Sequence, residues 1–168
     1  MSGMNHDLTD RVIGSWRDAR PELDMRALQV TARLSRIGPL LARRQEAIFD
    51  RFGLGRGEVG ALSALRIAGL PYRLSPTRLG KGLMLSSAGV TSRIDRLERR
   101  GLVRRLPDPD DRRGVIVELT DQGLEVVDAA VAALAISDRE LIERLDPEEV
   151  AQFEALLRKF LGGLELPE

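Results

Sequence analysis

The sequence contains no cysteine and a single histidine, His6, and these two shortages exclude several classes of chemistry. Without cysteine there is no thiol redox switch, no catalytic thiolate, and no cysteine-ligated zinc or iron–sulfur centre. One histidine cannot supply a multi-histidine metal cluster, and a Ser-His-Asp triad could be built only from His6. We therefore expect a protein that is not an enzyme and that holds neither a metal nor a cofactor.

Long apolar runs are missing as well. The longest, Val126 to Ile136, is short and is interrupted by Asp128, so we expect no membrane-spanning segment. Residues 1–10 are polar and acidic and lack a signal-peptide pattern. With 168 residues, 43% hydrophobic and 31% charged, the chain is expected to be a cytoplasmic globular protein, either one domain or one protomer with an appendage.

The net charge of zero conceals a strong polarity along the chain. Residues 1–70 carry a net charge of +3, residues 71–114 carry +6 and residues 115–168 carry −9. A basic middle segment indicates contact with an anion, whereas an acidic tail keeps the molecule soluble. A surface charge that merely drifts along the chain explains the same numbers, so charge alone does not decide between the two.

Apolar residues at helical spacing predict a mainly helical chain. We expect helices over residues 7–20, 24–52, 56–68, from 76 onward, from 86 or 87 to 100, 120–144 and from 147 onward. Residues 69–74 are expected to form a turn, and two short strands are expected over residues 102–106 and 115–119. Ser75 before Pro76, Thr120, and Asp146 before Pro147 are predicted N-caps.

The order helix, turn, helix, strand, charged hairpin, strand between Ser75 and Leu119 is that of a winged helix-turn-helix. In the second helix Val90, Ile94 and Leu97 form the inward stripe. The opposite face carries small, polar and cationic side chains suited to base edges and phosphates, namely Ala88, Ser92, Arg96 and Arg99. Asp95 on the same face differs from them in charge, and its carboxylate is expected either to accept a hydrogen bond from cytosine or to orient Arg99 by an i, i+4 pair. An ordinary amphipathic helix with a solvated charged face shows the same pattern.

The hairpin between the two strands favours DNA binding. Arg112 and Arg113 are expected near its tip, where an arginine suits a narrow minor groove. Asp108, Asp110 and Asp111 are close enough in sequence to hold these arginines by ion pairs. A solvated turn rich in aspartate and proline is the alternative interpretation.

Residues 83–123 strongly resemble the MarR family of bacterial transcription regulators. The match is closest over 90–98, 101–105, 107–113 and 119–120 with Gly123, and helix order extends it over essentially the whole chain. The resemblance implies a homodimer with a dimerisation lobe built from residues 1–52 and 120–168, and a DNA-binding domain over 53–119. It implies DNA contacts at Ser87, Ser92, Arg96 and Arg112 or Arg113. Our full set of candidate DNA-binding residues adds Ser75, Thr77, Ser86, Arg93 and Arg99.

A narrower resemblance concerns the branch of the family that responds to urate and similar anionic metabolites. Its extra N-terminal helix with a tryptophan and its two pocket arginines are matched here by Trp16, Arg93 and Arg105. The branch's pocket aspartate is replaced by Gly60, which argues against urate itself. Trp16 as a hydrophobic anchor, Arg105 as a phosphate contact or surface charge, and Arg93 as a DNA contact remain alternatives.

The leading hypothesis is a repressor that binds a pseudo-palindromic operator as a homodimer and is released by a small anionic or aromatic effector. The alternative is a winged-helix protein-interaction module without sequence-specific DNA binding. The expected partners are therefore double-stranded DNA, a second copy of the chain and a small effector.

Overall fold

A computed structural model describes residues 6–83, 87–109, 111 and 114–164, with side chains at 82, 83, 87 and 88 left out. The chain divides into two compact units, residues 1–47 and 48–168. The boundary falls inside the helix α2 (Arg26–Asp50). Each unit is described by itself.

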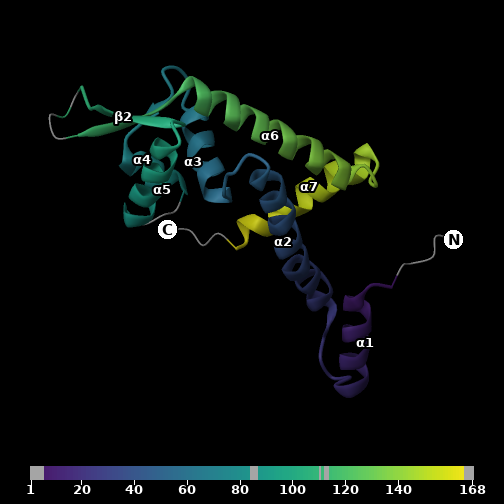
Figure 1. Cartoon of the computed structure of the whole chain (residues 1–168). Coiled ribbons are helices and arrows are strands. Elements are labelled where there is room, and N and C mark those ends of the chain that lie inside the picture. The colour runs from purple at the N-terminus through teal and green to yellow at the C-terminus, as the bar shows by residue number, and fades with distance from the viewer. Residues whose placement is uncertain (1–5, 84–86, 110, 112–113, 165–168) are drawn as a thin grey trace. The chain divides into compact units, whose positions relative to one another are not determined.

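The first unit contains α1 (Leu8–Ala19) and most of α2 (Figure 1). Asp7 caps α1 by accepting hydrogen bonds from the backbone amides of Thr9 and Asp10. Arg33 of α2 binds the carboxylates of Asp7 and Asp10, with N···O distances of 3.0 Å and 2.7 Å. The hydrogen bond from Arg33 is the main reason why the pKa of Asp10 is lowered.

The second unit holds the remaining elements, and its central part matches the expected order. In chain order these are α3 (Arg56–Ile67), β1 (Arg73–Leu74), α4 (Pro76–Leu83), α5 (Ser87–Arg99), β2 (Val103–Pro107), β3 (Val115–Leu119), α6 (Asp121–Ile142) and α7 (Pro147–Gly162). Gly101 follows α5 with a φ of +70°, a left-handed conformation that glycine adopts at little cost. The predicted mainly helical fold with a small β-hairpin is therefore confirmed.

The sheet has the order β1-β3-β2, and both pairs of neighbouring strands are antiparallel. Residues 69–74 were expected to form only a turn, but Arg73 and Leu74 pair with Glu118 and Val117 of β3. Two residues are too few for a period-two pattern, so the sequence carries no visible sign of this strand. Figure 1 shows the β2–β3 hairpin extending away from α4 and α5.

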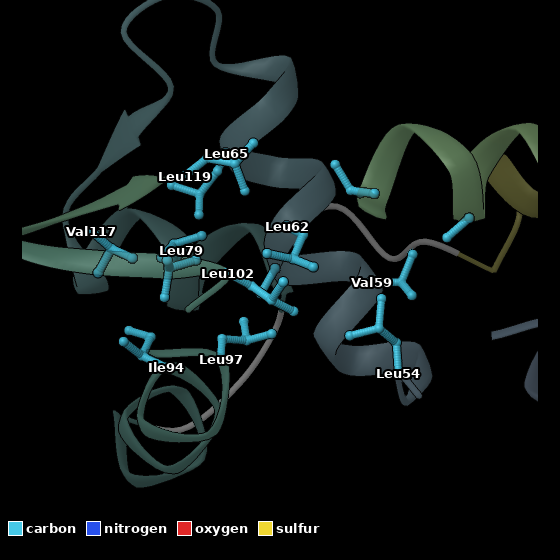
Figure 2. Close-up of a cluster of buried hydrophobic side chains, with 14 of the residues drawn as sticks. Leu54, Val59, Leu62, Leu65, Leu79, Ile94, Leu97, Leu102, Val117 and Leu119 are labelled. Carbon is cyan, nitrogen blue, oxygen red and sulfur yellow. The ribbon is translucent and has the colours of Figure 1, made fainter. Parts of the chain in front are cut away.

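The hydrophobic core of the second unit joins every element of the predicted winged domain (Figure 2). α3 contributes Val59, Leu62 and Leu65, and α5 contributes the predicted stripe of Val90, Ile94 and Leu97. Leu79 of α4 and the strand residues Val103 and Val117 complete it. Because residues from both strands pack against the helices, the hairpin is fixed to the helix-turn-helix rather than joined to it flexibly.

Candidate nucleic-acid interface

The first helix of the predicted helix-turn-helix begins as expected. The hydroxyl of Ser75 accepts a hydrogen bond from the backbone amide of Arg78 at 3.4 Å, and Pro76 is the first residue of α4. Thr77 is exposed in the first turn of this helix. Ser75 therefore has a capping role in the structure, whereas its contact with DNA stays a prediction.

The predicted outer face of α5 is exposed. Ser92, Asp95, Arg96 and Arg99 all reach the surface, opposite the buried stripe. Arg93 is only half exposed, as its position beside that stripe predicts. Ser86, Arg112 and Arg113 lie outside the described residues, as does the side chain of Ser87, so their predicted DNA contacts stay predictions.

Arg96 is oriented by two side chains. Its Nε donates to Oε1 of Glu58 at 3.1 Å, and its Nη1 donates to the hydroxyl of Ser92 at 2.9 Å. Glu58 lies in the first turn of α3, where its Oε2 also accepts a hydrogen bond from the backbone amide of Gly55 at 2.9 Å. One carboxylate thus stabilises the start of α3 and holds a cation of α5.

Arg93 of α5 and Arg100, which directly follows α5, contact the segment from residue 52 to residue 57. Arg100 donates from Nη1 to the carbonyl oxygen of Gly53 at 2.6 Å and from Nη2 to that of Phe52 at 3.1 Å. The guanidinium of Arg93 lies against Gly57, and its Nε is buried without a hydrogen-bond partner among the described residues. Since residues 93, 96 and 100 share one helical face, three arginines fasten α5 to residues 52–58.

Arg105 of β2 binds two carboxylates of α5. Its Nη2 lies 2.5 Å from Oδ1 of Asp95, and its Nη1 donates to Glu98. Partial burial disfavours the charge of Arg105, but the hydrogen bonds to these carboxylates outweigh it and raise its pKa. The two elements expected to contact DNA, α5 and the hairpin, are therefore joined by this three-residue ion cluster.

One of the two interpretations of Asp95, that its carboxylate orients Arg99 one turn later, is wrong. In the structure Arg99 donates instead to the backbone carbonyl of Asp95 at 3.3 Å, and the carboxylate binds Arg105. Arg105 of β2 is thus the cation that pairs with the Asp95 carboxylate, and it binds Glu98 of the same helix as well.

Glu118 is a buried carboxylate on the outer face of the sheet. It lies between Arg73 of β1 and Arg104 of β2, the residues directly opposite it on the neighbouring strands. Arg73 reaches Oε1 at 2.8 Å, and Arg104 donates to Oε2. The hydrogen bond from Arg104 is the largest cause of the lowered pKa of Glu118.

Trp16 belongs to the first unit, whereas Arg93 and Arg105 belong to the second. Trp16 is 48% exposed on α1 and, with Val12, Ser15 and Ala19, lines a shallow groove of about 340 Å³. Ile13 of the same helix is buried. The common effector site that the resemblance implies therefore stays a prediction.

Sequence reasoning missed the carboxylates that face the arginines, namely Glu58, Glu98 and Glu118. Glu58 carries a visible signal, because glutamate three residues after an N-cap is typical of a helix start. Its second contact, with Arg96, joins residues 38 positions apart, which no local pattern indicates. Among the described residues no cluster of His, Cys, Asp or Glu is suited to a metal ion, and none of the helices could cross a membrane.

Comparison with known proteins gives consistent results. Residues 52–114 match the sequence pattern of the MarR family. The chain is 35% identical to the HTH-type transcriptional regulator PecS of Dickeya dadantii (strain 3937) over 146 residues, which cover 87% of this chain and 88% of PecS.

Two solved structures extend the likeness to three dimensions. Sco5413, a MarR family transcriptional regulator from Streptomyces coelicolor, superposes with a TM-score of 0.68 at 28% identity, covering 86% of this chain and 100% of Sco5413. A cysteine-to-serine variant of MarR from Escherichia coli, complexed with operator DNA, superposes with a TM-score of 0.67 at 25% identity, covering 93% and 99% of the two chains.

Proposed function

The chain belongs to the MarR family of transcriptional regulators, and we propose that it binds a pseudo-palindromic operator as a homodimer. Binding represses its own gene or a neighbouring one, and a small anionic or aromatic effector releases the protein from DNA.

The outer face of α5 is the observation that carries the proposal. Ser92, Arg96 and Arg99 are exposed on a helix whose opposite face is the core of the domain. Small and cationic side chains at the surface of such a helix suit the major groove. There arginine recognises guanine, and the serine hydroxyl can hydrogen-bond with either a donor or an acceptor on a base edge. The net charge of +6 over residues 71–114 supplies attraction to the phosphates.

The exposed apolar face of α7 supports the homodimer. Within Pro147–Gly162, all of which the structure describes, no side chain is buried. Leu156 is 65% exposed, and Phe153, Phe160 and Leu161 are exposed as well. A helix that leaves this much apolar surface in water gains from association with a second copy, and a two-fold operator matches a two-fold protein.

Arg93 supports an anionic effector. Its Nε is buried and has no hydrogen-bond partner within the part of the chain that the structure describes, which is costly for a cation, and a carboxylate or enolate oxygen would supply the missing acceptor. Arg105 is engaged by Asp95 and Glu98, so an effector that used it would have to compete with two carboxylates.

The test is binding to a fluorescent duplex containing the DNA upstream of the chain's own gene, compared with a scrambled duplex of equal length. We expect a protein dimer that binds the upstream duplex at least 1,000-fold more tightly than the scrambled one, in the usual range for specific recognition. The affinity is expected to fall steeply with salt. Equal, weak binding to both duplexes would favour the protein-interaction module instead.

A further inference from the structure

We propose that Glu58 is a specificity-determining positioning residue: it holds Arg96 in the orientation in which Arg96 recognises a guanine of the operator. This inference rests on the proposed DNA-binding function. It concerns a residue outside the recognition helix, on the first turn of α3.

The contact geometry fixes the guanidinium plane. Glu58 takes the Nε–H of Arg96, and Ser92 takes one N–H of its Nη1. Neither contact uses Nη2. The terminal edge formed by Nη1 and Nη2 is the edge with which an arginine donates two parallel hydrogen bonds to O6 and N7 of guanine.

Burial distinguishes this ion pair from an ordinary surface pair. The side chain of Glu58 is 13% exposed and that of Arg96 is 46% exposed, so the carboxylate is enclosed while the cation reaches the surface. Glu58 is also held by the amide of Gly55. A fixed acceptor behind an exposed arginine reduces the side-chain entropy that the arginine loses on binding.

The end of α5 is fixed to the segment from residue 52 to residue 57. Arg100 binds the carbonyl oxygens of Phe52 and Gly53, one turn beyond Arg96. The helix that carries Arg96 and the turn that carries Glu58 therefore keep a constant separation. The orientation of Arg96 is a property of the folded domain and not of one flexible side chain.

The proposal predicts an effect with an unusual sign. A carboxylate near DNA repels phosphates, so its removal ordinarily strengthens binding to every sequence. If Glu58 positions Arg96, its neutralisation weakens binding to the operator while binding to random DNA is unchanged or strengthened. The change in operator affinity therefore has one sign if Glu58 only repels phosphates and the opposite sign if it positions Arg96.

The main variant is Glu58→Gln, because glutamine keeps an oxygen that can accept from Gly55 while it loses the charge that holds Arg96. The matched control is Asp128→Asn, which removes a carboxylate that pairs with Arg66 at the other end of α3, at 3.0 Å. Both are measured by fluorescence anisotropy on the footprinted operator, on random DNA, and on a series of operators in which each guanine is replaced by adenine.

We expect Glu58→Gln to weaken operator binding about tenfold, the order expected for loss of one well-placed bidentate contact. The penalty for replacing one symmetry-related pair of guanines should shrink by a similar factor. Asp128→Asn should leave both quantities unchanged. An operator affinity that is unchanged or increased in Glu58→Gln would overturn the proposal. So would an equal loss of affinity for every duplex, with the penalty for replacing each guanine the same as in the wild type.

Arg96→Lys is the second variant, and it leaves the start of α3 intact if Glu58→Gln folds poorly. Lysine keeps the charge but has no planar fork, so the penalty at the same guanine pair should disappear. In the double variant Glu58→Gln with Arg96→Lys, the loss of operator affinity should not exceed the loss caused by Arg96→Lys alone. Additive losses would show that Glu58 does not act through Arg96. Failure of the wild-type protein to prefer any operator would refute the proposed function itself.

Discussion

The guanidinium of Arg93 occupies the place of a side chain at Gly57, since a β-carbon at position 57 would be 2.3 Å from Nη2. Glycine at this position therefore provides the space that Arg93 occupies. The contact lies at the end of a long side chain, which can rotate away from a new methyl group without a change in the backbone.

Gly57→Ala is predicted to displace Arg93 while the domain stays folded. We expect the thermal midpoint to change by only a few degrees, since one turn of α3 exchanges a glycine for a better helix former. The stabilisation by bound aromatic carboxylates should be lost, because their proposed partner has moved. Thermal-shift measurements with a panel of such compounds test this.

Gly14→Ala is the matched control for that measurement, because a β-carbon built there has no described atom within 4 Å outside the local backbone of its own helix. It should raise the free energy of unfolding by about 1 kcal/mol and keep the wild-type response to carboxylates. If aromatic carboxylates stabilise Gly57→Ala as much as they stabilise the wild type, Arg93 is not part of the effector site.

Arg105→Ala is predicted to weaken binding to all DNA sequences by about tenfold. The substitution leaves Asp95 and Glu98 without their cation, so two carboxylates of α5 repel the phosphates. The angle between the hairpin and α5 also loses its ion cluster. Anisotropy titrations on operator and random DNA measure the effect, and the further substitution Glu98→Gln should restore part of the affinity. A pure loss of effector response with unchanged DNA affinity would contradict this role.

Glu118→Gln is predicted to lower the free energy of unfolding at neutral pH by about 1–2 kcal/mol, less than for a fully buried pair because both arginines are partly exposed. The pKa of Glu118 is lowered in the folded protein, mainly by Arg104. Its ion pairs therefore stabilise the protein above the ordinary glutamate pKa of 4.5, which applies to the unfolded chain, and this contribution disappears as the pH falls through the lower folded value.

Thermal unfolding between pH 7 and pH 3 distinguishes the two proteins. The wild type should lose stability in acid more steeply than Glu118→Gln, so that the difference between them narrows as the pH falls. A constant difference across this range would mean that the ionised form of Glu118 is not what stabilises the sheet.

Local signals made much of the second unit predictable from sequence. Thr120 and Asp146 cap α6 and α7 as their spacing indicated, since each side chain accepts from the amide three residues later. The strand 115–119 and the inward stripe of α5 also agree, because hydrophobic period reports burial directly.

Contacts between distant residues were not predictable. Arg73 and Glu118 are 45 positions apart, and their pairing depends on a two-residue strand whose register no pattern specifies. The same is true of Glu58 and Arg96. Charged residues on a helix or strand indicate an exposed face, but which partner each one selects is decided by the packing of the elements that carry them.

Leu156→Glu is predicted to convert the dimer to a monomer, because it places a charge in the apolar surface that α7 is proposed to bury against a second copy. Light scattering after size-exclusion chromatography measures the mass. Arg158→Gln makes the same change in net charge at an exposed position and should leave the dimer intact. If both variants remain dimeric, this face of α7 is not the interface.

Gly123→Ala is predicted to be the most destabilising of these substitutions, with a loss of about 3 kcal/mol or more. A β-carbon at position 123 would be 2.0 Å from the carbonyl oxygen of Leu102. Unlike the end of Arg93, that oxygen cannot rotate away, because it accepts a hydrogen bond from the amide of Thr120 at 3.1 Å. Thr120 is itself held by accepting from the amide of Gly123 and donating to the carbonyl of Gly101. Relief of the clash therefore requires α6 to move away from the start of β2, which breaks the cap of α6.

Chemical denaturation measures the loss of unfolding free energy in Gly123→Ala, and Gly162→Ala, where the space is open, serves as the control. A Gly123→Ala protein as stable as that control would mean that the close approach of α6 to β2 is not required for the fold.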